Sequence, residues 1–155
     1  MGVPDPPRLE FAFELKAEVG PTVELGPGSS GIRRTVAILG GTLEGPFVSA
    51  RILPGGADWQ FAEADGLTFV DAHYAIETSD AVRIEVRNQG VRHGPTAVME
   101  RIAAGEPVPS SAYYFRTTPR FSPPKGKYEW MKRSVFVASG ERHAALVIVR
   151  VWKVL

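Results

Sequence analysis

The sequence predicts an all-β protein, an antiparallel β-barrel of about 8–10 strands of the calycin-like kind with one short helix. Its apolar segments alternate with polar residues at a period of two, which is typical of strands with one packed and one solvated face. Sixteen glycines and 13 prolines separate these segments, as turn residues do. Because open twisted sheets seldom grow this wide, we expect the sheet to close, which leaves no exposed edge for aggregation.

The first half of the chain is predicted to consist of strands joined by turns. Residues 9–19 (LEFAFELKAEV) alternate between apolar and mostly charged positions, which indicates one strand. Two strands follow in residues 32–39 and 45–53, separated by glycines that permit a tight bend or a bulge. Residues 66–78 and 79–88 are the next two strands, and the short polar connector between them predicts a hairpin.

One segment departs from the strand pattern. Pro95 suits the first turn of a helix, and Val98 and Ile102 follow at helical spacing. Gly105 stands where a helix commonly ends. These features predict one short helix over about Pro95 to Ala104, and we expect no other helix in the chain.

Three strands complete the predicted barrel. Residues 111–121 form a strand that is expected to break at Pro119, because proline cannot donate to a strand ladder. Residues 127–139 and 144–155 are the last two strands, which we expect to pair as a hairpin around Gly140. The last segment is apolar on both faces, which indicates a strand that is covered on both sides or closes the barrel.

Size, charge and composition restrict the class of protein. The chain has 155 residues and suits one domain, expected over residues 8–155 after a flexible N-terminus of residues 1–7. Its net charge of +1 gives no electrostatic support for a nucleic-acid or anionic-membrane partner. The absence of cysteine fits a reducing compartment, and we find neither a signal peptide nor an apolar run of about 20 residues. We therefore expect a cytoplasmic protein.

The most unusual stretch is RILPGGADWQF, residues 51–61, where a Pro-Gly-Gly turn leads directly into an acid, a tryptophan and an amide. In a functional interpretation, Trp59 stacks on an aromatic ligand while Asp58 and Gln60 orient the ligand or transfer a proton. In a structural interpretation, Asp58 accepts hydrogen bonds from the backbone of the turn and Trp59 packs in the core. Both interpretations are open at the level of the sequence.

Two neighbouring segments also carry ionisable residues. Asp71, His73 and Glu77 share one face of a predicted strand, so they either line a polar lumen or form a solvated outer face. Arg92 and His93 lie just before the helix. In one interpretation, His93 acts as an acid or base near neutral pH. In the other, it stays neutral and forms a hydrogen bond with the local backbone, because a helix N-terminus disfavours the protonated form.

The segment YYFRTTPRF holds two arginines flanked by aromatic residues. Arg116 and Arg120 are suited to binding a carboxylate, a phenolate or an enolate. Alternatively, they pair with carboxylates inside the barrel, such as those of Asp58, Asp71 or Glu44, because a buried carboxylate needs a partner of this kind.

Metal and cofactor signatures are missing from the sequence. His73, His93 and His143 are isolated and lack the spacing of metal ligands. The chain contains no GxSxG elbow, and its glycine-rich stretches GPGSSG and ILGGTLEG lack the features of phosphate-binding or dinucleotide-binding loops. We therefore expect neither a metal nor a cofactor.

Several longer motifs occur in a characteristic order: GGTLEGP, RILPGGADWQ, DAHYAIET, VRNQGVRHGP, AAGEPVPSSAYYFRTTPRF, WMKRSVFVASGER and VWKVL. Together they resemble domain-of-unknown-function family 3237, also called uncharacterised protein family 0311, over about residues 8–155. The resemblance implies a small β-barrel domain, often a dimer, with no established general activity. Some fungal members of what looks like the same family are linked to flavonoid pathways as chalcone-isomerase-like cyclases, which is a hint about reaction type.

The resemblance also bears on individual residues. The family pattern recurs at Glu44, Arg51, Asp58, Trp59, Asp71, Tyr74, Arg92, His93, Tyr114, Arg116, Arg120, Trp130 and Arg133. His73 and His143 depart from the pattern, so we do not treat them as catalytic candidates. The resemblance supplies no catalytic set to transfer, so the roles below rest on the chemistry of the side chains.

The leading hypothesis is a cofactor-free isomerase, cyclase or lyase that acts on a small aromatic or enolisable molecule held in the barrel. Asp58 is the candidate general base. Arg116, together with Arg120, is expected to stabilise an enolate or phenolate oxyanion. Glu44 or His93 is the candidate second proton carrier.

Other residues are expected to contact the substrate, with Trp59 and Tyr114 on either side of it. The expected contacts are Arg51, Trp59, Gln60, Asp71, Tyr74, Arg92, Tyr114, Arg120, Trp130 and Arg133. Two rival hypotheses remain: a non-catalytic small-molecule binding barrel, and a structural or oligomeric protein in which Trp59 and the arginines and tyrosines of YYFRTTPRF lie at a subunit contact. A raised pKa of Asp58 favours a working base, whereas a lowered pKa favours an acid paired with an arginine.

Overall fold

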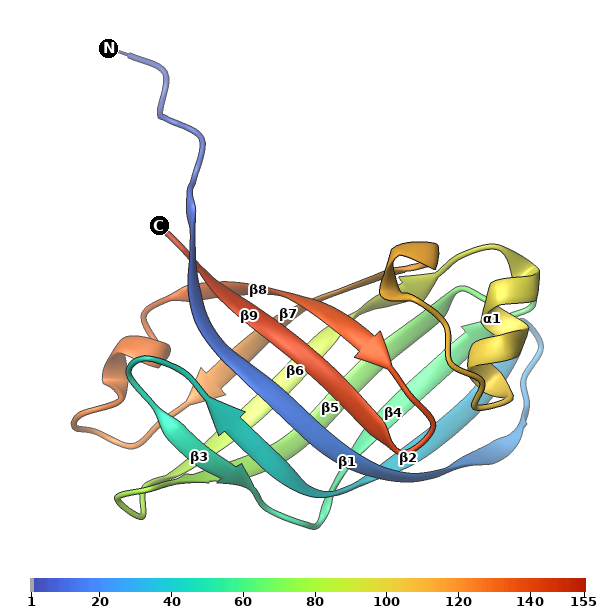
Figure 1. The fold of residues 1–155 in the computed structure, drawn as a ribbon, viewed down its shortest axis with the longest axis horizontal. Helices are drawn as coiled ribbons and strands as arrows, with labels where there is room; N and C mark the ends of the chain where they lie inside the picture. Colours follow the sequence, from blue (N-terminus) through green and yellow to red (C-terminus); the bar gives the residue numbers. More distant parts are fainter. Residues whose placement is uncertain (1) are drawn as a thin grey trace.

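A computed structural model describes residues 2–155, so residue 1 of the predicted flexible segment 1–7 lies outside the described residues. Residues 2–8 form no strand or helix and are exposed, and their flexibility stays a prediction. From Leu9 onwards the chain forms one antiparallel sheet that closes into a barrel, with a helix at one end (Figure 1).

The sheet has nine strands within residues 2–155. These are β1 (Leu9–Pro27), β2 (Gly31–Glu44), β3 (Ser49–Ile52), β4 (Gly56–Glu63), β5 (Thr68–Thr78), β6 (Arg83–His93), β7 (Tyr114–Ser122), β8 (Val135–Arg142) and β9 (Leu146–Val154). The helical segments are α1 (Thr96–Ala103) and two short 3₁₀ helices, η1 (Ser110–Ala112) and η2 (Glu129–Met131). The prediction of an antiparallel all-β barrel with one short helix is confirmed.

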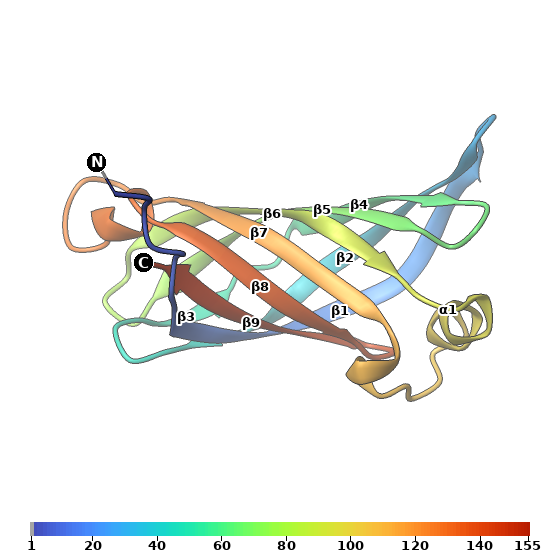
Figure 2. The same ribbon diagram turned by 90° about the horizontal axis from the view of Figure 1, so that it is seen from above.

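Strand β1 closes the barrel because it pairs with both β9 and β2. The other neighbours follow around the ring in the order β9, β8, β7, β6 and β5 (Figure 2). Strands β3 and β4 each pair with β2 and with β5, but at different ends, so these two short strands share one position in the ring. A register shift between β1 and β2 lies between the pairs Glu18–Gly40 and Val19–Ile38, and Gly41 beside it has a φ of 132°, which favours glycine.

One end of the barrel is filled by apolar side chains. Phe13 is fully buried, and its ring lies edge-on to Phe121 at 5.3 Å and tilted to Phe136 at 5.8 Å between centroids. The segment that contains η2 adds the buried side chains of Tyr128 and Met131 to this core. The segment around η2 lies at the end of the barrel opposite α1, so this core extends to that end (Figure 1).

A smaller apolar cluster lies beside α1, where Ile102 packs with Tyr113 and Phe115. The helix follows Pro95 and ends at Ala103, and Gly105 just beyond it has a φ of 76° and donates its N–H to the Ile102 carbonyl. The predicted short helix is therefore confirmed. No helix within residues 2–155 is both long and apolar enough to span a membrane.

Residues 56–63 form a strand, β4, where the sequence predicted a turn followed by a binding segment. The turn itself comprises residues 53–55, with Gly55 at a φ of 106°. Asp58, Trp59 and Gln60 are consequently strand residues, paired on both sides with β2 and β5 over most of the length of β4. Their side chains follow the alternation of a strand.

Two other strand boundaries differ from the prediction. Strand β8 begins at Val135, because residues 129–131 form a 3₁₀ turn instead of extended chain. Strand β7 continues through Pro119 rather than breaking there. Strand β7 pairs with β8 only at Arg116 and Thr117, so the ladder on that side has already ended where the proline lacks an N–H.

Gly140 lies inside β8 and not in a hairpin turn. It pairs with Val149, and a Cβ at this position would collide with the ring of Phe115. The β8–β9 turn follows Arg142 instead. The glycine therefore allows an aromatic ring to approach the backbone closely. From the sequence alone, a glycine in this role cannot be distinguished from a glycine in a turn.

Candidate functional site

A cavity lies inside the barrel between the two apolar clusters. It encloses about 60 Å³ and is lined by side chains of β1, β2 and β4 to β9. A wider groove of about 520 Å³ lies between α1 and the β4–β5 turn. Gln60, Arg92 and Arg142 line both, so the groove leads into the cavity. A ligand larger than a few water molecules must therefore extend from the cavity into the groove.

Strand alternation decides which side chains of β4 face the cavity. Asp58 and Gln60 are two residues apart, and both line it. Trp59 lies between them in the chain and is 56% exposed. The structure therefore does not bring Trp59 together with Asp58 around a ligand, because neighbouring residues of a strand point to opposite faces.

Two donors hold the Asp58 carboxylate. Gln60 Nε2 donates to Oδ2 at 2.7 Å, and the backbone N–H of Asp71 donates to Oδ1 at 2.9 Å. Burial raises the pKa of Asp58, although these hydrogen bonds and the charges of Arg92 and Arg142 act in the opposite direction. A carboxyl group with a raised pKa is suited to general acid–base chemistry near neutral pH.

Tyr74 faces the same cavity from β5. Burial, together with the nearby charge of Asp58, raises the pKa of the Tyr74 phenol above its ordinary value. The phenol therefore stays protonated at neutral pH. It is available as a hydrogen-bond donor to an oxygen atom of a ligand, and its role as a substrate contact stays a prediction.

Three arginine side chains, Arg34 of β2, Arg92 of β6 and Arg142 of β8, surround the passage from the groove to the cavity. Burial lowers the pKa of each guanidinium, that of Arg92 to about 10, so all three remain charged at neutral pH. The guanidinium of Arg92 lies 5.1 Å from the centre of the Phe115 ring. Arg34 Nη2 donates to Thr68 Oγ1 at 3.4 Å.

Several buried polar atoms have no hydrogen-bond partner within residues 2–155. They are Arg34 Nε, Arg92 Nε, Arg142 Nη1, Asn88 Oδ1 and Thr117 Oγ1. All five side chains line the cavity or the groove. Because an unpaired buried polar group costs about 1–3 kcal/mol, such groups normally have partners. The interior is therefore suited to a polar ligand that brings acceptors to the arginines and a donor to Asn88.

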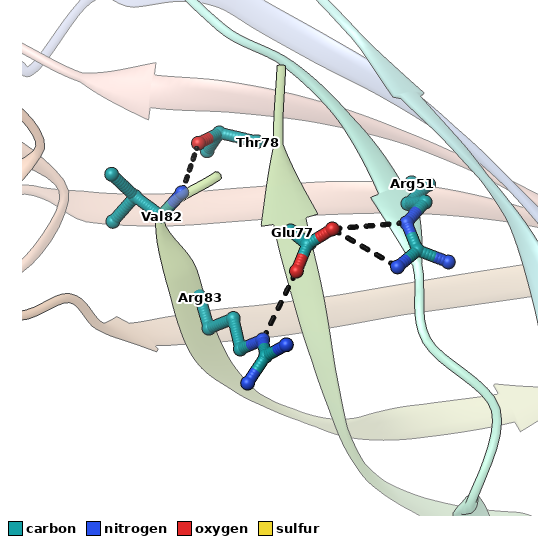
Figure 3. Close-up of polar contacts among 5 residues, drawn as sticks. All are labelled: Arg51, Glu77, Thr78, Val82 and Arg83. Atoms are coloured by element: carbon teal, nitrogen blue, oxygen red, sulfur yellow. Dashed lines mark hydrogen bonds and ion pairs between the residues drawn. The ribbon is translucent and has the colours of Figure 1, made fainter. Parts of the chain in front are cut away.

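The structure places most of the other predicted site residues on the outer face of the barrel. Arg51 donates two hydrogen bonds to Glu77 Oε1, at 2.9 and 3.2 Å, and Arg83 donates one to Oε2 at 3.0 Å (Figure 3). Beside them, the Val82 N–H donates to the Thr78 hydroxyl in the β5–β6 turn (Figure 3). Arg51 belongs to this exposed network and not to the cavity.

Asp71 and Arg120 also point outwards. Two hydrogen bonds from Arg87, at 2.9 and 3.1 Å, hold the pKa of Asp71 below its ordinary value. Only the backbone N–H of Asp71 reaches the site, where it supports Asp58. Arg120 is exposed and donates to Gln89 at 3.4 Å.

Four further candidates lie away from Asp58. His93 and Tyr114 stack with their ring centres 5.0 Å apart, and the Arg116 guanidinium lies 5.3 Å from the Tyr114 ring. All three residues are exposed. Glu44 is also exposed, and it accepts a hydrogen bond from Ser49 at 3.0 Å at the far end of β2. Side chains alternate between the two faces of a strand, and these side chains lie on the face that points away from the lumen.

Trp130 and Arg133 belong to the closed end of the barrel. Trp130 packs against Phe136 with 6.1 Å between ring centres, and the Lys153 ammonium lies 5.9 Å from its ring. Arg133 follows η2 and is exposed. Neither lines the cavity or the groove. Of the predicted residues, the structure brings together Asp58, Gln60, Tyr74 and Arg92.

Four polar residues of the interior were not among the predicted site residues. They are Arg34, Asn88, Thr117 and Arg142. The alternation of inward and outward residues along a strand identifies them when it is followed beyond the apolar positions. Arg34 precedes Val36 by two positions on the inward face of β2, and Arg142 follows Gly140 by two on β8.

The family described as "Protein of unknown function (DUF3237)" matches residues 7–154. A UPF0311 protein of Rhodopseudomonas palustris is 38% identical over 151 residues, which cover 96% of this chain and 99% of that relative. The chain belongs to the DUF3237 family. The resemblance drawn from the sequence motifs is thereby confirmed.

Solved structures similar to this DUF3237 protein have the same fold. A crystal structure of a Rhodopseudomonas palustris protein matches with a TM-score of 0.95 and 36% identity, covering 98% of this chain and 100% of that one. A protein of Acinetobacter baumannii described as β-barrel-like matches with a TM-score of 0.86 and 34% identity, covering 100% of both chains. These likenesses agree with the closed sheet described above.

One relative of this DUF3237 protein carries an activity in its name. A hydroalkoxylation enzyme of Penicillium herquei is 35% identical over 83 residues, which cover 54% of this chain and 55% of the enzyme. A crystal structure of an enzyme from the same fungus has a TM-score of 0.75 at 22% identity and covers 100% of this chain and 99% of that one. At that identity, the structural likeness concerns the fold alone.

Proposed function

We propose that the barrel interior converts a small aromatic or enolisable molecule by acid–base chemistry without a cofactor, as an isomerase, cyclase or lyase. One observation carries this proposal: Asp58, whose pKa is raised by burial, faces an enclosed cavity beside the Tyr74 phenol and the Arg92 guanidinium. A base, a neutral hydrogen-bond donor and a cation thus surround one small cavity. These three groups are the ones needed to transfer a proton and to stabilise the oxyanion that forms.

Each group has a defined role in this chemistry. The Asp58 carboxylate removes a proton from a hydroxyl group or from a carbon next to a carbonyl, while Arg92 and Tyr74 stabilise the oxyanion. In an isomerisation or a ring closure, the protonated Asp58 then returns the proton to a different atom of the substrate, so no atom is gained or lost. In a lyase reaction the proton goes to the leaving group, so the two products together contain all atoms of the substrate. Arg92 takes the role that the sequence suggested for Arg116 and Arg120, whose side chains lie outside. Positioned acid–base catalysis of this kind contributes about 10²–10⁴-fold.

The similarity to a hydroalkoxylation enzyme supports ring closure as the reaction type. In hydroalkoxylation an O–H group adds across a C=C bond: the O–H bond breaks, the π bond is consumed, and one C–O and one C–H bond form. A single carboxylate serves both halves, because it accepts the hydroxyl proton and delivers it to carbon. The reaction needs no oxidant or reductant, which agrees with a site built from Asp58, Tyr74 and Arg92.

Turnover of 2′-hydroxychalcone, followed by absorbance, tests the proposal because its cyclisation adds a phenol across a conjugated alkene. Deuterium incorporation into enolisable aromatic ketones in D₂O, followed by NMR, is a second readout. We expect Asp58→Asn to lower either rate about 10²-fold or more. Asp71→Asn, on the outer face of the adjacent strand, is the matched control and should keep the rate. Full activity of Asp58→Asn would exclude this residue as the base.

A second candidate function is binding without catalysis. The two hydrogen bonds from Gln60 and from the Asp71 backbone favour it, because they also describe a carboxylate held as a fixed structural group. This candidate is favoured if the protein binds the probes but the two activity readouts stay at the uncatalysed rate.

We further propose that the protein forms a homodimer and that it is located in the cytoplasm. Trp59 is a large aromatic residue that is 56% exposed on the outer face of β4, which supports a contact between subunits. Light scattering of the purified protein measures the mass directly. Substitution of Trp59 by Ser should shift a dimer towards the monomer without changing ligand affinity.

A further inference from the structure

The proposed chemistry uses one guanidinium at the oxyanion, yet three line the passage to the cavity. Arg34 Nε, Arg92 Nε and Arg142 Nη1 are buried donors without an acceptor in the described part of the chain. Arg92 is only 5% exposed, so its donors are largely removed from bulk water. Burying several charged donors without a partner is costly, and an anion supplies the missing acceptors.

The charge balance of the interior points in the same direction. Asp58 is the one carboxylate that lines the cavity among residues 2–155. Glu63, Asp65 and Glu100 line the outer groove, where solvent screens them, and Glu24 acts on one of the arginines from β1. The inner site therefore stays positively charged even when Asp58 is ionised. The outer acids disfavour a ligand with several negative charges.

Contacts hold two of these arginines in place and leave their Nε–H groups free. Arg34 Nη2 donates to Thr68 Oγ1 at 3.4 Å, and Thr68 is fully buried. The guanidinium of Arg92 packs on the Phe115 ring at 5.1 Å from its centre. Planar guanidinium groups held in this way match the two oxygens of a carboxylate and lose little freedom on binding.

Strand register sets the spacing between these arginines and Asp58. Arg34 pairs with Gln60 across β2 and β4, and Val36 pairs with Asp58. The backbone of Asp58 therefore lies two residues further into the barrel than the level of Arg34, about 6–7 Å along the strand. A single aromatic ring with substituents at opposite ends spans a separation of this order.

We infer that Arg34, Arg92 and Arg142 bind the carboxylate of the substrate, which is a singly charged aromatic or α,β-unsaturated acid whose reactive group lies deeper, beside Asp58. Arg92 lines both the groove and the cavity, so it contacts this carboxylate as well as the oxyanion that forms beside Asp58. The inference rests on the proposed function in using the same cavity, but the binding step does not depend on catalysis. Asn88 Oδ1, which is buried without a donor among the described residues, provides an acceptor for a hydroxyl group at the far end of such a ligand.

Calorimetric titration with benzoate, 4-hydroxybenzoate and benzamide tests this site, because benzamide has the shape of benzoate without its charge. We expect at least about tenfold tighter binding of benzoate than of benzamide, and tighter binding still of 4-hydroxybenzoate. Arg92→Met and Arg142→Gln should each weaken benzoate binding at least about tenfold. The exposed controls Arg51→Gln and Arg120→Gln should bind as the wild type does. Asp58→Asn should bind benzoate more tightly, because a negative neighbour is removed.

Circular dichroism identifies any variant that fails to fold. If the buried Arg92→Met is such a variant, Arg142→Gln and Arg34→Gln, at less buried positions, decide the question. Equal affinity for benzoate and benzamide overturns the inference, as does benzoate binding that is unchanged in both of these variants. A loss in Arg51→Gln as large as that in Arg142→Gln also overturns it.

The inference and the proposed function fail separately. Selective benzoate binding by a protein whose Asp58→Asn variant keeps full turnover ends the acid–base role and leaves the carboxylate site. Loss of turnover in Asp58→Asn, without any preference for benzoate over benzamide, ends the carboxylate site and leaves the acid–base role.

Discussion

Gln60 Nε2 lies 2.7 Å from Asp58 Oδ2, and both side chains line the cavity from the same face of β4. Because the amide donates, it favours the ionised carboxylate and opposes the effect of burial on the pKa of Asp58. The acid therefore keeps carboxylate character in surroundings that otherwise favour its neutral form. Gln60 acts through Asp58 and is a positioning residue in the proposed chemistry.

Replacing Gln60 should change the titration of its neighbour. In Gln60→Ala the donor is lost while burial remains, so we expect the pKa of Asp58 to rise further above its ordinary value. Carboxyl ¹³C NMR as a function of pH measures the change, and the rising limb of the pH–rate profile should move to higher pH with it. Gln89→Ala, on a different strand, is the control. A lowered pKa of Asp58 in Gln60→Ala would be the wrong sign for this account.

Stability should fall as Asp58 ionises. Its pKa in the folded protein lies above the ordinary value of 3.8, so between these two values the native state binds more protons than the unfolded chain. The free energy of unfolding therefore decreases as pH rises through this window and stays lower above it. Asp58→Asn should remove the decrease, as measured by urea unfolding at pH values from about 4 to 8. Parallel pH dependence of the two proteins would contradict the raised pKa.

The aromatic core at the closed end should dominate stability. Phe13 is fully buried against Phe121 and Phe136. Phe13→Ala removes these contacts and leaves a cavity, so the free energy of unfolding should fall by about 3–5 kcal/mol in a urea titration. Phe47, which is 67% exposed, supplies the control, since Phe47→Ala should change it by no more than about 0.5 kcal/mol. Similar losses in the two variants would refute the assignment of this core.

The ion pairs of the outer face should be independent of the interior. Arg51→Ala removes two hydrogen bonds to Glu77, so the pKa of Glu77 should rise towards its ordinary value, since Arg51 is the main cause of its lowering. Benzoate affinity and probe turnover should stay at the wild-type level, and Tm should change little. If either property of the interior fell sharply in Arg51→Ala, the separation of the two faces would be incorrect.

The period of two was sufficient to predict most of the barrel. It failed at β4 because the inward positions of that strand are Asp58 and Gln60, so the apolar alternation on which the prediction depends is absent there. It also failed around η2, where Tyr128 and Met131 pack into the core from a short helical turn. Aromatic and apolar residues in close succession look like a strand when only the sequence is available.

Half of the interior site was predicted from the sequence, and the other half required the closed ring. Asp58 and Gln60 were predicted because an acid and an amide beside a glycine turn are unusual, whereas Tyr74 and Arg92 were included because the family pattern recurs there. Arg34, Asn88, Thr117 and Arg142 were not predicted, because charged and polar side chains ordinarily face water. Which face of each strand points inwards depends on the pairing of β1 with β9, a contact between the two ends of the chain.

Titration of the Asp58 side-chain carboxyl by ¹³C NMR, assigned by comparison with Asp58→Asn, is the most direct measurement of whether this barrel encloses a working acid. We expect a midpoint above the ordinary value of 3.8, because burial outweighs the donors and the arginines around it. A midpoint at or below that value would mean that the neighbouring guanidinium groups fix Asp58 as a permanent anion, and the acid–base account of the interior would be wrong.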